Sequence, residues 1–323
     1  MSDVLIQNYS FESYVKDKEM LRKKKILQYI DKAGCGLEIG PSHNPIAPKK
    51  NGYNVHIIDH LSREDLKLKY KEDNSVNLDN IEEVDFVWKG ESYADLTGKQ
   101  KYYDWIIASH VIEHTPDLIG FLQDCSTILK DDGVISLVVP DKRYCFDHFR
   151  PISGISKVLD HHIQKNKYPS PGTVLEGYLN AVSMSGNIAW NAKETGDYKF
   201  IFSLEDTLNS MKSVQEDKAY VDVHSWCFVP HSFRLLIHDL FSIGLIPFQE
   251  MAFSPTDGCE FYLTLSRHGE GINKSRLEML NIIDEEIKDL PIKLKQTESG
   301  ADVPEPFLAS LKNFIRRVRG RLT

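Results

Sequence analysis

The amino-acid sequence predicts an α/β protein built around a largely parallel β-sheet. An apolar strand over residues 36–39 ends in a glycine turn, and a second strand over residues 55–58 ends in Asp59, nineteen residues beyond Gly40. Further along, two more apolar strands flank a helix whose apolar side chains recur at helical spacing. These strands span residues 104–109 and 133–141, and the helix spans residues 118–129. Strands that alternate with helices pair in parallel through crossover connections.

The turn after the first strand favours a ligand that contains a ribose but no phosphate. A glycine turn lets the main chain approach a ligand, and an acid after the second strand accepts hydrogen bonds from ribose hydroxyls. Ser42 and Asn44 stand where a dinucleotide fingerprint needs glycines, so a pyrophosphate would be poorly held. Glu38 would repel a phosphate but suits the cationic part of S-adenosylmethionine. A plain strand-to-helix connection is the alternative interpretation of this turn.

The order of these segments resembles the successive motifs of class I S-adenosylmethionine-dependent methyltransferases. The segments that carry the resemblance are residues 37–40, Asp59, residues 103–114 and residues 129–134. Residues 233–240, 244–246 and 260–265 look like the last helix and the closing antiparallel strand pair of that fold.

The resemblance implies a Rossmann-like seven-stranded sheet and a division of the chain into four parts. These parts are an N-terminal helical segment (1–33), the cofactor-binding core (34–141 and 227–267), an inserted substrate lid (142–226) and a C-terminal helical tail (268–323). The insertion follows the fifth strand and is expected to be mostly helical. It would lie above the carboxyl ends of the strands, where ligands bind in open α/β sheets.

The resemblance also implies a set of cofactor-binding residues at the ends of the strands. They are Glu38, Gly40, Pro41, Ser42, Asp59, Ser109 and His110, with Gly90 and Glu91 as contacts for the adenine. In the N-terminal helix, the basic run of residues 22–25 is expected to be a solvated face. The alternative is a wall of the cofactor site, with Tyr9, Phe11 and Tyr14 folded over the ligand.

Methyl transfer to oxygen requires removal of the hydroxyl proton, for which histidine is the natural base. Asp222 and His224 are predicted to act together, because alternate residues of an extended segment point to the same side. Trp226 would offer a face to a sugar. A second candidate group follows the fifth strand and consists of Asp141, Arg143, Tyr144 and His148. For both groups, hydrogen-bonded lid structure is the alternative.

No metal ligand is predicted. Residues 110–114 match H-x-x-E-H, a zinc-hydrolase motif. However, this segment directly follows a buried strand and Pro116 comes next, which disfavours a helix that would place His110 and His114 on one face.

The insert resembles methyltransferases associated with the biosynthesis of bacterial surface polysaccharides such as O-antigen. This resemblance implies O-methylation of a sugar or glycan acceptor. A small-molecule O-methyltransferase and a non-catalytic scaffold in a glycan-assembly complex are the alternatives.

Composition and charge restrict the partners and the compartment. The formal net charge of -8 disfavours nucleic acid as a partner, and five scattered cysteines suit reduced thiols in the cytoplasm. Residues 307–322 form a basic amphipathic pattern. This pattern predicts either peripheral contact with the inner face of a membrane or a glycan-assembly partner, or docking on the protein's own core.

Overall fold

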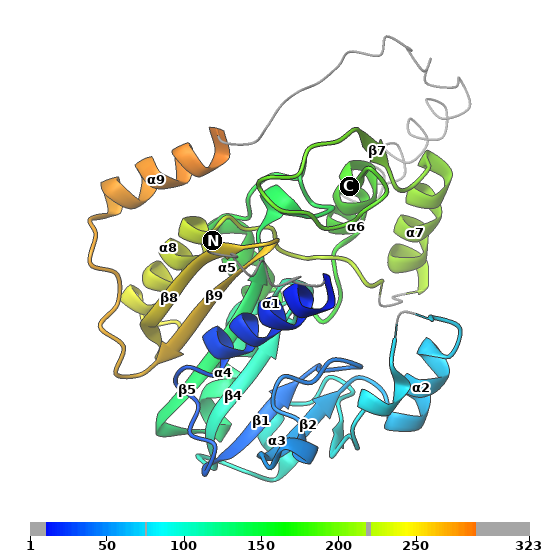
Figure 1. Ribbon diagram of the computed structural model, residues 1–323. Coiled ribbons are helices and arrows are strands. Elements are labelled where there is room, and N and C mark those ends of the chain that lie inside the picture. Colours follow the sequence, from blue (N-terminus) through cyan, green and yellow to red (C-terminus); the bar gives the residue numbers. More distant parts are fainter. Residues whose placement is uncertain (1–10, 75, 218–220, 289–323) are drawn as a thin grey trace, which may run out of the picture. The chain divides into compact units, whose positions relative to one another are not determined.

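The computed structural model describes residues 11–74, 76–217 and 221–288 and shows the predicted α/β fold. Its main sheet has seven strands in the order β3-β2-β1-β4-β5-β9-β8 (Figure 1). The strands are β1 (Cys35–Ile39), β2 (Asn54–Asp59), β3 (Phe86–Val87), β4 (Tyr103–Ser109), β5 (Leu129–Pro140), β8 (Gln249–Asp257) and β9 (Glu260–Ser266). The first five strands pair in parallel, and β9 pairs antiparallel with both β5 and β8. The carboxyl ends of β1, β2 and β4 therefore meet at one edge.

Helices cover both faces of the sheet. The helices are α1 (Phe11–Ile26), α2 (Arg63–Tyr70), α3 (Tyr93–Thr97), α4 (Leu118–Ile128), α5 (Ile155–Ile163), α6 (Pro171–Asn180), α7 (Leu204–Asp217), α8 (Pro230–Ser242) and α9 (Arg276–Lys288). Alternate residues of β4 point to opposite faces of the sheet. Trp105 and Ile107 pack in one cluster with Ile26 of α1. Ile106 and Ala108 pack in the other cluster, with side chains of α4 and α8. The sheet is therefore the middle layer of the molecule's core.

One glycine of β1 is required by the close approach of β4. A Cβ atom at Gly36 would lie 2.1 Å from the ring of Trp105, which is itself fully buried. Any side chain at this position must displace the indole. The indole N–H donates to the carbonyl of Asp31, which holds the ring in place.

The connection from β1 to β2 contains no α-helix. It consists of a loop and one short 3-10 turn, Lys49–Asn51. Pro41, Pro45 and Pro48 lack the N–H groups that a helix needs, which explains the irregular path. The strand-to-helix connection that we considered for this turn is therefore not formed.

The closing strand pair differs from the sequence prediction in its first strand. Residues 244–246 were expected to form that strand, but β8 begins at Gln249. Gly244 has a φ of 76° and its N–H donates to the carbonyl of Phe241. The glycine thus ends α8, and the strand starts only after the turn.

In its described residues, the insertion between β5 and α8 contains three α-helices, α5, α6 and α7, and also a small antiparallel pair that was not predicted. This pair consists of β6 (Val182–Met184) and β7 (Tyr198–Phe200). Val158 of α5 and Trp226 belong to the main core cluster. The insertion therefore shares its core with the sheet.

The C-terminal part of the chain is described as far as α9. The predicted basic amphipathic pattern over residues 307–322 lies outside the described residues, as does Tyr9. Among the helices that are described, none has both the length and the apolar character needed to cross a bilayer.

Candidate active site at the carboxyl edge of the sheet

The turn after β1 lies against the segment that follows β4. Gly40 has a φ of 62°, a conformation that favours glycine, and its N–H donates to the carbonyl of Ile58 at 2.8 Å. A Cβ atom at Gly40 would lie 3.0 Å from Cγ2 of Val111. The carbonyl of Pro41 accepts from the N–H of Asn44, which closes the turn. The turn and the segment after β4 thus form one compact unit.

Asp59 closes the glycine turn from the end of β2. Its carboxylate is only 2 % exposed and accepts hydrogen bonds from the main-chain N–H groups of Ser42 at 3.0 Å and His60 at 2.7 Å. The Ser42 hydroxyl in turn contacts the hydroxyl of Tyr70 at 3.0 Å. Nδ1 of His60 also lies 2.6 Å from Oδ1, so Oδ2, which accepts only from Ser42, keeps a further acceptor position.

Glu38 holds the loop that follows the turn. Its two carboxylate oxygens accept from the N–H groups of Ile46 at 2.6 Å and Ala47 at 3.0 Å. Burial raises the pKa of Glu38 to about 7, in spite of these two hydrogen bonds. The structure therefore gives Glu38 a role beneath the loop, where it is 2 % exposed, and not the predicted place beside a ligand's cationic part.

Gly90 and Glu91 follow β3 at the same edge of the sheet. Gly90 has a φ of 102° and open space around its Cα. The carbonyl of Glu91 accepts from the indole N–H of Trp88, and its carboxylate accepts from the N–H of Lys89. The segment is a self-contained turn whose glycine is exposed.

A charged network joins the end of β4 to α1 and β9. The guanidinium of Arg22 donates to Ser109 Oγ at 2.9 Å and to Glu260 Oε1 at 2.6 Å. His110 Nε2 lies 2.6 Å from Glu260 Oε2, and Tyr262 donates to the same carboxylate. Arg22 was predicted to belong to a solvated face, and Glu260 was not predicted as a site residue, although its position at the start of a strand at this edge could have indicated it.

These contacts shift the pKa values of the paired groups in opposite directions. Burial lowers the pKa of His110, but the carboxylates of Glu113 and Glu260 outweigh it and raise the pKa to about 9. Burial raises the pKa of Glu260, but His110 and Arg22 outweigh it and lower the pKa to about 2. The imidazolium and the carboxylate therefore stabilise each other.

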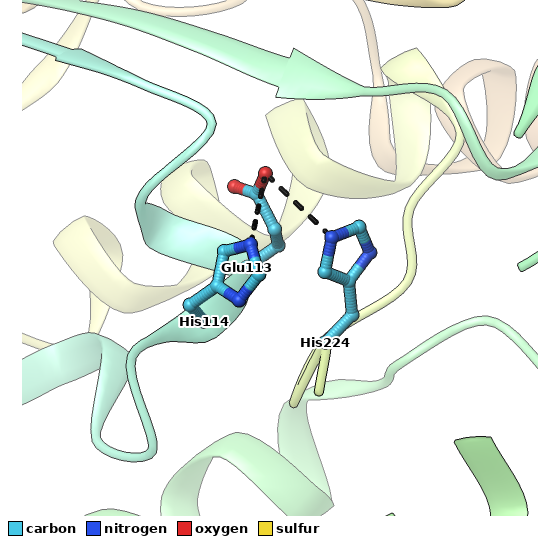
Figure 2. A group of neighbouring side chains, drawn as sticks. All are labelled: Glu113, His114 and His224. Carbon is cyan, nitrogen blue, oxygen red and sulfur yellow. Dashed lines mark ion pairs between the residues drawn. The ribbon is translucent and has the colours of Figure 1, made fainter. Parts of the chain in front are cut away.

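Glu113, His114 and His224 form a cluster beside this network (Figure 2). Glu113 and His114 come from the 3-10 turn Ile112–His114 after β4, and His224 comes from the segment that leads into α8. Nε2 of each histidine lies 4.0 Å from Oε1 of Glu113. The main chain fixes this arrangement, because the N–H of Ser225 donates to the carbonyl of Glu113 at 2.6 Å.

Each histidine of the cluster has its own carboxylate, and the predicted pairing of Asp222 with His224 is not formed. Nδ1 of His224 lies 2.5 Å from Oδ2 of Asp147, a buried residue that sequence analysis did not single out. Asp222 instead lies 2.9 Å from Nδ1 of His114. Alternation along the extended segment could not reveal Asp147, because that residue is 77 positions away in the chain.

The second candidate group is engaged in the structure of the insert. Asp141 is fully buried and accepts hydrogen bonds from the guanidinium of Arg143 and the hydroxyl of Thr256. Nδ1 of His148 lies 2.7 Å from the carbonyl of Arg143, and burial lowers the pKa of this histidine. Tyr144 packs with apolar side chains of the insert. These side chains are therefore part of the hydrogen-bonded structure of the insert, which was the alternative to a catalytic role.

Trp226 does not offer an exposed face to a sugar. It is fully buried in the main core, and its indole N–H donates to the carbonyl of Thr115 at 2.6 Å. The tryptophan therefore anchors the segment that carries His224 and has no surface for an acceptor.

Comparisons with known proteins give one family and a set of distant structural similarities. The model of a family described as a methyltransferase domain matches residues 11–184, more than half of the chain. A comparison with curated protein sequences found no match.

Three solved structures are distantly similar to this chain. The S-adenosylmethionine dependent methyltransferase from Mesorhizobium loti is 9% identical, with 74% of this chain and 94% of that chain covered and a TM-score of 0.37. The PH0226 protein from Pyrococcus horikoshii OT3 is 13% identical, with 80% and 93% covered and a TM-score of 0.35. The SAM dependent methyltransferase from Aquifex aeolicus is 17% identical, with 40% and 73% covered and a TM-score of 0.30.

Proposed function

The chain belongs to the methyltransferase-domain family, and from this premise we propose that it transfers the methyl group of S-adenosylmethionine to a hydroxyl of a sugar or glycan. Two parts of the proposal have separate support. The cofactor is supported by the groups at the carboxyl edge of the sheet, and the hydroxyl acceptor by the cluster of Glu113, His114 and His224.

The donor set at the carboxyl edge fits adenosylmethionine. Asp59 retains acceptor capacity for ribose hydroxyls, and the Gly40 turn offers main chain without a side chain in the way. We assign Asp59 to the ribose, the exposed turn at Gly90 and Glu91 to the adenine, and Ser109 and His110 to the wall of the site. When bound, adenosylmethionine supplies an electrophilic methyl group on its sulfonium sulfur.

The observation that carries the hydroxyl acceptor is the buried imidazole of His224. Its Nδ1 is held by Asp147, and its Nε2 faces Glu113 without a hydrogen bond. An acceptor hydroxyl at this cluster would give its proton to Nε2 of His224 as its oxygen bonds to the methyl group. Asp147 keeps the ring oriented and stabilises its positive charge. Val111 joins this cluster to the Gly40 turn.

The sugar class is supported by the insert. Its resemblance to methyltransferases of surface-polysaccharide biosynthesis motivates the proposal. Exposed aromatic rings on the insert, at Phe149, Tyr168 and Phe200, provide apolar faces against which sugar rings can pack. The alternative acceptor is a hydroxyl of a free small molecule. Identifying the methylated product by mass spectrometry distinguishes it from a glycan.

The cofactor assignment is tested by calorimetry with S-adenosylmethionine and its demethylated product. Asp59→Ala should weaken binding at least tenfold, because a hydrogen bond to a charged group contributes roughly 1.5 to 3 kcal/mol. Asp131→Ala is the matched control, since Asp131 is an exposed acid paired with Lys101 on the opposite edge. Equal affinity of Asp59→Ala and wild type would refute the assignment.

The acceptor is tested by mass spectrometry of nucleotide sugars and glycans after incubation with S-adenosylmethionine. A gain of one methylene mass identifies the substrate. His224→Ala should lower turnover by about a hundredfold or more and leave affinity for the demethylated cofactor unchanged. Binding of cofactor without a methylated product from any hydroxyl compound would favour the non-catalytic scaffold.

A further inference from the structure

We propose that Glu113, His114 and His224 bind a divalent transition-metal ion. Within residues 11–74, 76–217 and 221–288, this is the one group of three ligating side chains whose ligand atoms all lie within 4.8 Å of one another. Two imidazoles and one carboxylate are a donor set typical of zinc, manganese and iron(II) sites. No metal ligand was predicted from the sequence, because the H-x-x-E-H motif pairs His110 with His114.

The first support is the state of the Glu113 carboxylate. Glu113 is fully buried, and neither of its oxygens has a hydrogen-bond partner among the described residues. The nearest histidine nitrogens lie at 3.4 to 4.0 Å, so they form ion pairs with the carboxylate but are too distant or poorly aligned for hydrogen bonds. Buried carboxylates are normally hydrogen-bonded, paired or bound to a metal. A cation between the carboxylate and the two histidines would satisfy this group.

The second support is the pair of carboxylates behind the histidines. Asp147 contacts Nδ1 of His224, and Asp222 contacts Nδ1 of His114. Both rings therefore present Nε2 toward Glu113, as Figure 2 shows for the cluster. Histidines that bind metals almost always donate their other ring N–H to a carboxylate, a carbonyl or a water. The arrangement matches this rule at His224; at His114 the carboxylate of Asp222 lies 2.9 Å from Nδ1 but is not aligned for a hydrogen bond.

The distances require only a small closure. Each Nε2 lies 4.0 Å from Oε1 of Glu113. Ligands held at about 2.1 Å from an ion in tetrahedral geometry are roughly 3.4 Å apart. All ligand atoms lie within 4.8 Å of one another, so side-chain movements of up to about 1 Å per ligand complete the site. His114 is about one third exposed, so the remaining coordination position is accessible to solvent or to an acceptor.

The role of the ion rests on the proposed function. A hydroxyl bound at the open position would have a lowered pKa and release its proton to water, so its oxygen attacks the methyl group as an alkoxide. The bond between carbon and oxygen forms while the bond between carbon and sulfur breaks, which leaves the neutral thioether of the demethylated cofactor. When the ion is bound, Nε2 of His224 is a metal ligand, so the hydroxyl proton goes to water; transfer of the proton to His224, as proposed above, applies to the metal-free protein.

The test begins with metal binding by the full chain. Protein treated with a chelator and dialysed is titrated by calorimetry with Zn²⁺, Mn²⁺ and Mg²⁺, and the ion content after desalting is measured by elemental analysis. We expect one Zn²⁺ or Mn²⁺ per chain, weaker binding of Mg²⁺, and an increase in thermal unfolding temperature on binding. Retention of less than a tenth of an equivalent of every ion, with no thermal shift, would overturn the inference.

Variants separate ligands from structural side chains. Glu113→Gln and His224→Ala should each lower metal affinity at least a hundredfold, and Asp222→Asn by ten- to a hundredfold through the orientation of His114. His231→Ala is the matched control, because His231 pairs with Glu286 away from the cluster, and should bind the ion as wild type does. Equal affinity of Glu113→Gln and wild type would refute the site.

Thermal unfolding of the metal-free protein distinguishes a metal-ligand role of Glu113 from a purely structural ion pair. Because Glu113 also pairs with His110, the neutral amide should cause only a modest loss of unfolding temperature in the metal-free protein if Glu113 is chiefly a metal ligand. A marked loss in Glu113→Gln, together with no metal binding by wild type, would assign Glu113 to a structural ion pair instead. Titration of the same samples with the demethylated cofactor keeps the two proposals apart. If the cofactor binds and the metals do not, only the metal site fails; if the cofactor does not bind, the proposed function fails.

Discussion

Replacing Glu38 with glutamine should change how the stability of the protein depends on pH. Glu38 is 2 % exposed, and burial raises its pKa from 4.5 to about 7. Between these two values the folded state holds a proton that the unfolded state has released. The contribution of the protonated carboxyl is therefore complete below about pH 4.5 and is lost as the pH rises through about 7. At about 1.4 kcal/mol per pH unit, the loss amounts to roughly 3 kcal/mol.

Glutamine keeps the shape of the side chain and removes the titration. Its amide has one acceptor oxygen for the two N–H groups of Ile46 and Ala47, so we expect Glu38→Gln to be less stable than wild type at pH 5, by about 1 to 3 kcal/mol. By pH 8 the wild type has lost its roughly 3 kcal/mol, and the two proteins should be nearly equal or the variant slightly more stable.

The assay is urea unfolding followed by tryptophan fluorescence at pH 5, 6, 7 and 8. Groups common to both proteins cancel in the difference between them. Glu72→Gln is the control for the loss of one acidic side chain, because Glu72 is exposed. If the difference between Glu38→Gln and wild type is the same at pH 5 and pH 8, the reasoning from burial is wrong.

Two further substitutions test the core and the charged network. Gly36→Ala places a Cβ atom 2.1 Å from the ring of Trp105 and should reduce the free energy of unfolding by about 2 kcal/mol or more; a change below about 0.5 kcal/mol in urea unfolding would contradict this. Arg22→Ala removes the hydrogen bonds to Ser109 and Glu260 and should cost about 1 to 3 kcal/mol. Lys24→Ala is the control, because Lys24 is exposed, and should change the free energy of unfolding by less than about 0.5 kcal/mol. Equal effects of the two variants would show that Arg22 belongs to a solvated face.

The fold could be predicted because its signals are local. Apolar runs of strand length alternate with a periodic helix, and this pattern alone specifies a parallel sheet. The strand at 249–257 was missed because its residues are only partly buried and polar side chains interrupt it. The turn at Gly244 therefore stood out more clearly than the strand after it.

The candidate site was harder to predict because its pairs join distant parts of the chain. The sequence identified His224 as a candidate but not Asp147, its partner in the insert. It identified Ser109 and His110 but not Arg22 and Glu260, which reach them from α1 and β9. Burial is equally non-local: nothing near Trp226 in the sequence shows that its ring is enclosed by the core.

The irregular connection after β1 has an electrostatic consequence for the ligand. An α-helix that starts at such a turn directs the equivalent of about half a positive charge at the bound group, which favours anions. Residues 40–53 form no such helix, so this fixed field is missing at Gly40. The charge at this edge is instead determined by side chains, among them Arg22 and His110, which are both paired with Glu260. The preference of this edge for a cationic or an anionic ligand can therefore be changed by substituting single residues, without rebuilding the backbone.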